Sequence, residues 1–201
     1  PAEQPHTGEA IAFLSSRIDR TFNILDVGCG SGEITAGVAQ LAANVVGIDR
    51  AEESIAAARD QYRKKGLRFE VGDAFEQLTR SGPRVDVVIL SHVLEHVDEP
   101  ELLLNLLADK CQFLYLEVPD FDHSALNRHR EYLGRDLIYQ DPDHRYEFDR
   151  SDIRLLLESC SFRLIDHEFR YGVQRYWCET TAEDNAGTSE EAPAVDHGSI
   201  R

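Results

Sequence analysis

The chain has 201 residues, 37 of them acidic and 21 basic, which gives a net charge of −16. This length fits one domain, which we expect to span residues 1–180, and the negative charge argues against a nucleic-acid partner, whose phosphates are bound through Lys and Arg. No apolar run reaches the length of a membrane span and the first residues lack the order of a secretory signal, so we expect a cytoplasmic protein, monomer or homodimer, with no membrane contact.

Short apolar runs alternate with helical patterns through the first half of the chain, in the order that βαβ units have. In chain order, the pattern predicts a helix over 7–20, a strand over 23–28, a helix over 34–41, a strand over 44–49, a helix over 51–64 and a strand over 67–73. The fold class is therefore predicted to be α/β.

The second half of the chain opens with a turn signal at 81–83, which leads into an apolar, β-branched strand of the kind that is covered on both faces. In order, we predict this strand over 85–91, a helix from Pro100, a strand over 113–118, a helix over 152–159 capped by Asp149 or Ser151, and strands over 163–169 and 173–178. The last two are expected to pair as a hairpin around Gly172. Residues 181–201 are small, polar and acidic, so we expect a disordered tail.

The cysteines argue against a zinc site or disulfides, and the scarcity of lysine bears on the salt conditions in which the protein works. The four cysteines lie far apart and form no C-x-x-C pair, so we interpret Cys29, Cys111, Cys160 and Cys178 as buried thiols and not as a zinc or disulfide framework. Only three of the 21 basic residues are lysines. An acid-rich, lysine-poor surface is compatible with a high-salt cytoplasm, and equally with ordinary compositional drift.

Residues 25–32, LDVGCGSG, form a glycine-rich loop between a predicted strand and a predicted helix. Glycines there permit a tight turn and let a ligand touch the backbone, while the start of the helix presents amide donors. Asp49 ends the next strand, where its carboxylate can accept hydrogen bonds from both hydroxyls of a ribose. The pattern predicts a site for a nucleoside.

The spacing of the glycines separates this loop from that of a nicotinamide enzyme. It is G-x-G-x-G, whereas a dinucleotide loop has G-x-G-x-x-G, and the place of the third dinucleotide glycine is taken by Glu33. A carboxylate at a helix N-terminus repels a pyrophosphate, whereas a sulfonium nucleoside with an amino-acid tail carries no phosphate. A dinucleotide site and a purely structural turn are the alternatives.

Four segments together resemble a known family. LDVGCGSG at 25–32, VVGID at 45–49, VGDAFE at 71–76 and DVVILSHVLEHV at 86–97 match, in order, motifs of the class I S-adenosylmethionine-dependent methyltransferases. The resemblance spans about residues 23–178. It implies a Rossmann-like, doubly wound sheet of seven strands, mostly parallel with an antiparallel hairpin at the carboxyl terminus and flanked by helices.

The resemblance also implies the cofactor, S-adenosylmethionine, and the residues that would bind it. Asp26, Gly28, Gly30 and Gly32 would line its methionine part, Asp49 with its neighbour Arg50 would hold the ribose, Asp73 with Ala74 would meet the adenine, and Ser91 would lie beside the reacting end. A carboxyl that only stabilises the fold at Asp26 and a turn former at Asp73 are the alternatives.

The segment from His92 to His96 follows the fourth strand and literally matches H-x-x-E-H, a zinc peptidase signature. It follows a buried strand, however, and the resembling family often has a leucine–glutamate–histidine run there without a metal, so no metal is expected. Ligands of such sheets bind beyond the carboxyl ends of the strands. His92 and His96 are therefore candidates to touch cofactor or substrate, with backbone-bonded histidines at a helix start as the alternative.

Residues 119–148 form a connection longer than a compact domain tolerates unless it has a function. It concentrates His123, His129, His144, Tyr132, Tyr139 and Tyr146. The resembling family commonly builds its substrate lid here, and aromatic and polar groups suit a small-molecule pocket; a solvated helical hairpin is the alternative. An oxygen acceptor would need a base near neutral pH, for which we select His96 or His144, with His129 behind them; a carboxylate acceptor would need none.

We therefore predict a methyltransferase that uses S-adenosylmethionine as cosubstrate and methylates a small molecule on oxygen or nitrogen. The alternative is a regulatory or scaffold protein that binds S-adenosylmethionine without turnover. The histidines and tyrosines of residues 119–148 favour catalysis.

Overall fold

A computed structural model of the chain describes residues 5–79, 84–136, 138 and 141–181. The turn predicted at 81–83, Tyr139 and nearly all of the predicted tail lie outside these residues. Among the residues described, no helix combines the length and apolar character needed to cross a membrane.

Seven strands form one sheet in the order β3-β2-β1-β4-β5-β7-β6. Their bounds are β1 Asn23–Val27, β2 Asn44–Asp49, β3 Leu67–Val71, β4 Val85–Ser91, β5 Cys111–Pro119, β6 Phe162–Arg170 and β7 Val173–Thr180. The first five strands pair in parallel, whereas β7 runs antiparallel to both β5 and β6. The predicted fold, a mostly parallel doubly wound sheet with an antiparallel hairpin, is confirmed.

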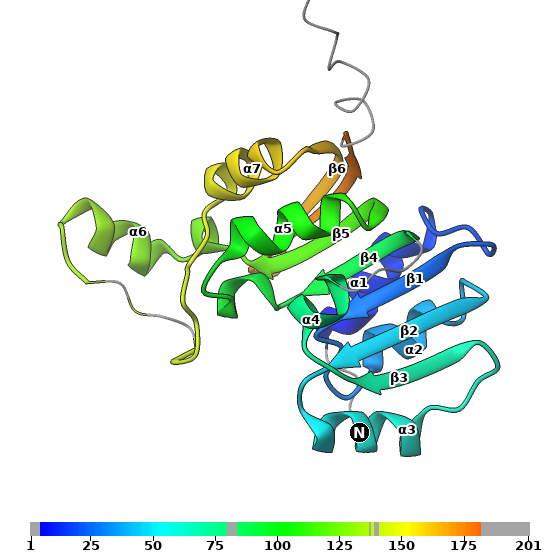
Figure 1. The fold of residues 1–201 in the computed structure, drawn as a ribbon. Coiled ribbons are helices and arrows are strands. Elements are labelled where there is room, and N and C mark those ends of the chain that lie inside the picture. Colours follow the sequence, from blue (N-terminus) through cyan, green and yellow to red (C-terminus); the bar gives the residue numbers. More distant parts are fainter. Residues whose placement is uncertain (1–4, 80–83, 137, 139–140, 182–201) are drawn as a thin grey trace, which may run out of the picture.

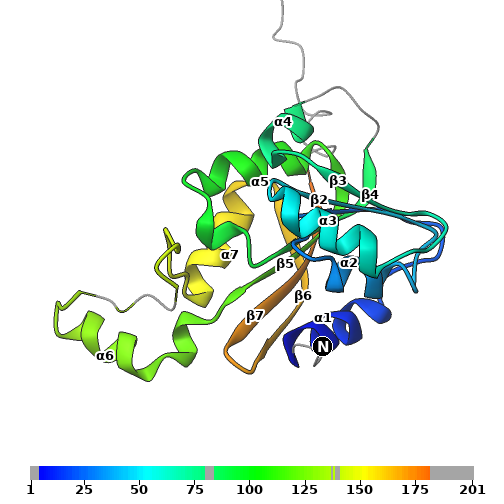
Figure 2. The same cartoon turned by 90° about the horizontal axis from the view of Figure 1, so that it is seen from below.

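Helices cover both faces of the sheet. Their bounds are α1 Pro5–Ser15, α2 Glu33–Val38, α3 Glu52–Gln61, α4 Ala74–Thr79, α5 Pro100–Ala108, α6 Ala125–Tyr132 and α7 Arg150–Ser159, with short 3₁₀ turns η1 Leu94–His96 and η2 Phe121–His123. Figures 1 and 2 show α1, α2 and α3 on one face, α4, α5 and α7 on the other, and α6 projecting away from the sheet.

Strand β4 is the centre of the core because both of its faces are buried. Val87 and Ile89 pack with α1 and α2, while Val88 and Leu90 pack with α5 and α7, and all four are 0% exposed. Alternate residues of a strand point to opposite faces, so an uninterrupted apolar run is what a doubly covered strand needs. The prediction of a central strand here is confirmed.

The elements differ from the prediction mainly at helix ends. Helix α1 stops at Ser15 instead of 20, because the chain turns there and Asp19 then accepts a hydrogen bond from the Thr21 amide at 2.8 Å. Helix α7 begins with a capping box in which Asp149 accepts from the amide of Asp152, so Asp149 and not Ser151 is the cap. The short helix α4 was not predicted.

Candidate active site

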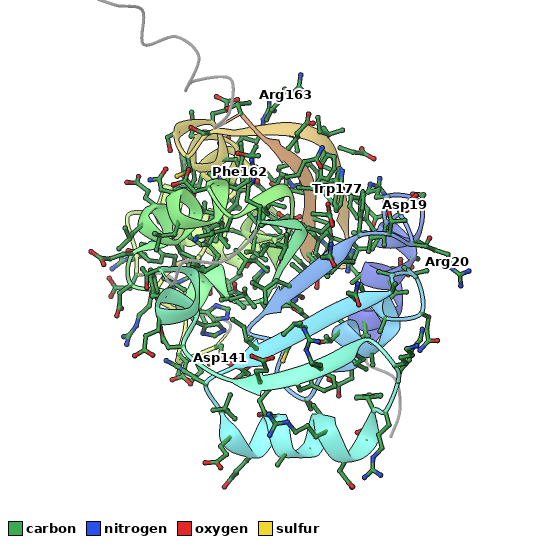
Figure 3. All side chains as sticks on the ribbon, turned by 45° about the vertical axis from the view of Figure 1, so that its right-hand side comes forward. Asp19, Arg20, Asp141, Phe162, Arg163 and Trp177 are labelled. Carbon is green, nitrogen blue, oxygen red and sulfur yellow. The ribbon has the colours of Figure 1, made fainter. Side chains whose placement is uncertain are left out.

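The candidate site lies where the strand order reverses, at the carboxyl ends of β1 and β4. These strands are neighbours in the sheet, and the chain leaves them in opposite directions, to β2 and to β5. Figure 3 shows Asp19 and Arg20 at the amino end of β1 and Asp141 at the opposite end of the sheet, where this site lies. Ligands of open α/β sheets bind at such reversals.

The glycine loop after β1 is held against its neighbours on two sides. A Cβ at Gly28 would lie 2.4 Å from Val93 Cγ2, and one at Gly32 would lie 2.6 Å from the Phe69 ring. A Cβ at Gly30 would meet nothing within 4 Å. All three glycines have positive φ, at 72°, 52° and 86° along the chain. Two glycines are thus required by packing, whereas Gly30 exposes its backbone to open space.

Asp49 connects the end of β2 to this loop. One of its carboxylate oxygens accepts a hydrogen bond from the Gly30 amide at 2.9 Å, and the other accepts from the Ala51 amide at 2.8 Å. Each carboxylate oxygen has a second lone pair, so the group can still accept hydrogen bonds from a ligand. The neighbouring Arg50 is exposed.

Asp26 lies beneath the loop and is 2% exposed. The Thr35 hydroxyl donates a hydrogen bond to its Oδ2 at 2.6 Å. Burial raises the pKa of Asp26 to about 7, with a smaller contribution from the charge of Asp49, and the Thr35 hydrogen bond offsets this only in part. Near neutral pH this carboxyl can therefore be neutral or charged, and a cation above it would favour the charged form.

Asp73 lies beyond β3 and is exposed. Its Oδ1 accepts a hydrogen bond from the Glu76 amide at 3.2 Å, so Asp73 caps the N-terminus of α4, whose first residue is Ala74. The turn-forming role considered for Asp73 is thus present, and it leaves the other carboxylate oxygen for a ligand.

Glu117 on β5 forms the centre of a buried ionic network beside the site. It is 1% exposed and accepts hydrogen bonds from Ser91 Oγ at 3.0 Å, Tyr115 Oη at 2.6 Å and Arg175 Nε at 2.6 Å. His92 Nε2 lies 3.3 Å from its Oε1. Burial by itself raises the pKa of Glu117, but the His92 hydrogen bond and the charge of Arg175 lower it to about 2.

Sequence reasoning missed Glu117 and Arg175 because each lies inside an apolar strand. The signal that could have identified them is the strand register, because Glu117 on β5 is directly paired with Arg175 on β7. A carboxylate and a guanidinium in two buried neighbouring strands must pair, because an isolated buried charge is costly.

His92 has a left-handed backbone conformation, and both nitrogens of its ring contact carboxylates. Its φ is 53°, and its amide donates to the Glu117 carbonyl at 2.9 Å. The ring lies between the carboxylates of Glu117 and Glu95, with Nδ1 3.1 Å from Glu95 Oε1. Burial, the largest single influence, lowers the pKa of His92, but the two hydrogen bonds outweigh it and raise the pKa to about 9. His92 is therefore a cationic donor at neutral pH.

Of the three histidines selected as bases, the structure brings two together. The rings of His96 and His144 meet edge to face, with centroids 4.9 Å apart, although 47 residues separate them in the chain from η1 to the α6–α7 connection. His129 lies on α6 and is exposed.

All four cysteines are free thiols, three of them buried and Cys29 half-buried.

Comparison with known proteins gives consistent matches. A family model described as a methyltransferase domain matches residues 18–161. The ubiquinone biosynthesis O-methyltransferase of Cereibacter sphaeroides is 40% identical over 78 residues, which cover 38% of this chain and 32% of that protein; its counterpart in Rhizobium etli is 33% identical over 95 residues, covering 47% and 38%. The chain thus spans about a third of the length of the curated relatives that it matches.

Solved structures show the same fold over most of the chain. Magnesium protoporphyrin IX methyltransferase from Synechocystis, with bound SAH, superposes with a TM-score of 0.66 at 21% identity, covering 88% of this chain and 82% of that one. A methyltransferase from Archaeoglobus fulgidus, described as SAM-dependent, gives a TM-score of 0.63 at 18% identity, covering 87% and 94%.

Proposed function

The chain belongs to the methyltransferase domain family, and from this premise we propose that it transfers a methyl group from S-adenosylmethionine to a small-molecule acceptor. The observation that carries the proposal is the open face of Gly30 beside the carboxylates of Asp49 and Asp26, at the reversal of strand order. A nucleoside with an amino-acid tail needs these groups: a carboxylate for its ribose and a second one near its ammonium.

The cofactor is proposed to extend along the carboxyl ends of the strands. Its ribose would bind Asp49 with Arg50 nearby, and its methionine part would lie over Gly28, Gly30 and Gly32, above Asp26. Its adenine would lie toward Asp73 and Ala74, and its reacting end near Ser91 and His92. This arrangement is supported by the short link from Asp49 to the Gly30 amide, 2.9 Å, which keeps the ribose and methionine positions adjacent.

Glu33 supports a phosphate-free ligand. It is the first residue of α2, is exposed, and accepts a hydrogen bond from Ser31 Oγ at 3.2 Å. A pyrophosphate at this helix start would meet that carboxylate, and the repulsion would offset the favourable helix dipole. A sulfonium cofactor meets no such repulsion.

The acceptor is proposed to be a small molecule methylated on oxygen or nitrogen, bound between the strand ends and residues 119–148. The relatives named as O-methyltransferases support oxygen. Methyl transfer needs mainly alignment, which can contribute roughly 7–11 kcal/mol, and a hydroxyl acceptor must also lose its proton. We assign that activation to His96 and His144, with His129 as the third candidate, because the cationic His92 has no free lone pair for a proton.

The proposal is tested by methyl transfer from radiolabelled S-adenosylmethionine into a metabolite extract, with SAH formation measured in parallel. We expect a labelled small product that identifies the acceptor. SAH binding without any transfer would instead support a regulatory protein that binds the cofactor. Full turnover in the triple variant of His96, His144 and His129 to alanine would remove the histidines from the mechanism.

A further inference from the structure

Three side chains beside the proposed acceptor position lie close enough together to bind a metal ion. Glu95, His96 and His144 each offer one ligand atom, and these atoms all lie within 4.8 Å of one another. This set differs from the one that the H-x-x-E-H pattern implies, because the ring of His92 turns away to Glu117 and Glu95.

Glu95 has a buried oxygen with no hydrogen-bond partner. Its side chain is 1% exposed; Oε1 meets His92, whereas Oε2 has no partner among the described residues. Leaving such an atom without a partner is unfavourable, and more so when the group is charged. A cation at Oε2 would remove this cost.

Both histidines of the cluster contact an oxygen through Nδ1. His96 Nδ1 lies 3.2 Å from the carbonyl of Asp143, and His144 Nδ1 lies 3.0 Å from Glu147 Oε1. In metal sites the second ring nitrogen typically donates to a carbonyl or carboxylate in this way, which fixes the tautomer and leaves Nε2 for the ion. The His144 side chain is 6% exposed, so this ring is held by its surroundings.

The backbone fixes the two halves of the cluster to each other. The amides of Arg145 and Tyr146 donate to the Glu95 carbonyl at 2.7 and 3.2 Å, and the Tyr146 hydroxyl donates to the Asp98 carbonyl at 3.0 Å. The segment that carries His144 is therefore attached to η1 at several points. This attachment places the three ligands together without help from an ion.

We propose that Glu95, His96 and His144 bind one divalent transition-metal ion of the Zn²⁺ class. Imidazole nitrogens favour such ions over Mg²⁺ and Ca²⁺, which prefer sets of oxygen ligands. In a tetrahedral site with metal–ligand bonds of about 2.0–2.2 Å, the ligand atoms lie about 3.3 Å from each other. The distances between the three ligand atoms here would therefore have to shorten by no more than about 1.5 Å. Rotation of the half-exposed His96 ring can provide most of this movement.

Three protein ligands leave one position of a tetrahedral ion open, which is typical of catalytic sites. The role of the ion rests on the proposed function. An acceptor hydroxyl bound there would lose its proton to solvent more readily. Its oxygen would then form the bond to the methyl carbon while the carbon–sulfur bond breaks and its electron pair stays on sulfur. With the ion bound, His96 and His144 would serve as its ligands, and this role would replace the proton-accepting role assigned to them above.

The test titrates Co²⁺ into the full chain after removal of metals with a chelator, with no methyl donor or acceptor present. We expect one equivalent, the visible absorption of four-coordinate Co²⁺, displacement by Zn²⁺, and no competition from Mg²⁺. Less than a fifth of an equivalent, or an absorption typical of hexa-aqua Co²⁺, overturns the proposal.

Variants locate the site. His144→Ala and Glu95→Gln should abolish the Co²⁺ absorption, and Glu147→Gln should weaken Co²⁺ binding about 10–100-fold. His167→Ala, which alters an exposed histidine outside the site, should bind Co²⁺ as the unmodified chain does. Because Glu95→Gln changes a buried residue, His96→Ala serves as the variant that keeps the core intact. Unchanged absorption in both His96→Ala and His144→Ala contradicts the assignment.

Calorimetry with SAH on the same samples separates the two proposals. Co²⁺ binding without SAH binding contradicts the proposed function alone, whereas SAH binding without Co²⁺ binding contradicts the metal site alone.

Discussion

The charge of Asp26 gives the site a pH dependence. In the unfolded chain this carboxyl has its ordinary pKa of 3.8, and in the folded chain burial raises it to about 7. Between these values the unfolded state ionises while the folded state stays protonated, so stability falls as pH rises from about 4 to 7 and is level above. By linkage the loss from this group is at most about 4 kcal/mol.

We therefore expect Asp26→Asn to become more stable relative to the unmodified chain as pH rises from 4 to 7. The Asn oxygen can still accept the Thr35 hydrogen bond. Thermal unfolding measured at each pH checks this, with Asp60→Asn as a control because the Asp60 side chain is 90% exposed. A difference in Tm that does not change with pH would contradict the shift at Asp26.

The glycines of the loop should respond differently to the same substitution. Gly30→Ala places a methyl group in open space at φ 52°, so it should lose about 1–2 kcal/mol of stability from the left-handed backbone and weaken SAH binding. Gly28→Ala has a similar backbone cost and also meets Val93 Cγ2 at 2.4 Å, so it should be clearly less stable. Urea unfolding and SAH calorimetry measure both effects. Equal stability of the two variants would contradict the packing described for Gly28.

Residue types alone gave only part of the site. Asp26, Asp49 and the three loop glycines could be found because a short segment of sequence carries their pattern. Glu117 and Arg175 could not, since their pairing joins strands that are far apart in the chain. The proximity of His96 and His144 depends in the same way on long-range contacts from residues 143–146 to η1.

At the scale of elements, the start of α7 offers a direct comparison of two possible caps. Asp149 accepts hydrogen bonds from the amides of Ser151 and Asp152 at 2.7 and 2.8 Å, and Ser151 is already inside the helix. Asp149→Ala should therefore lower the free energy of unfolding by about 0.5–2 kcal/mol, whereas Ser151→Ala should change it little. Urea unfolding of both variants checks this, and a larger loss for Ser151→Ala would contradict the cap.

The strands were more predictable than the helices. Strands β2 and β4 begin and end as predicted, because an apolar run with β-branched residues has few other stable arrangements. Helix α4 was missed because its six residues follow Asp73, which by itself predicts only a turn. Helix α6, ALNRHREY, has few apolar residues to place it by, so its position away from the sheet (Figure 1) could not be derived from sequence.

For the whole molecule, the net charge of −16 predicts a dependence on salt. Self-repulsion among like charges destabilises the compact state, and it is screened over about 10 Å at 0.1 M salt but about 3 Å at 1 M. We expect Tm at pH 7 to rise between 0.1 and 1 M KCl. At pH 5, close to the isoelectric point of about 4.8, the rise should nearly vanish. The same rise at both pH values would show that net charge is not its cause.

The central claim is that the fold builds a phosphate-free nucleoside site around Asp49. Isothermal titration calorimetry of SAH with the full chain tests it most directly, comparing the unmodified chain, Asp49→Ala and the exposed control Asp60→Ala. Loss of hydrogen bonds to a charged group predicts an affinity about 10–100-fold lower for Asp49→Ala and an unchanged affinity for Asp60→Ala. No binding by the unmodified chain, or equal affinity in Asp49→Ala with its fold intact, would contradict the account.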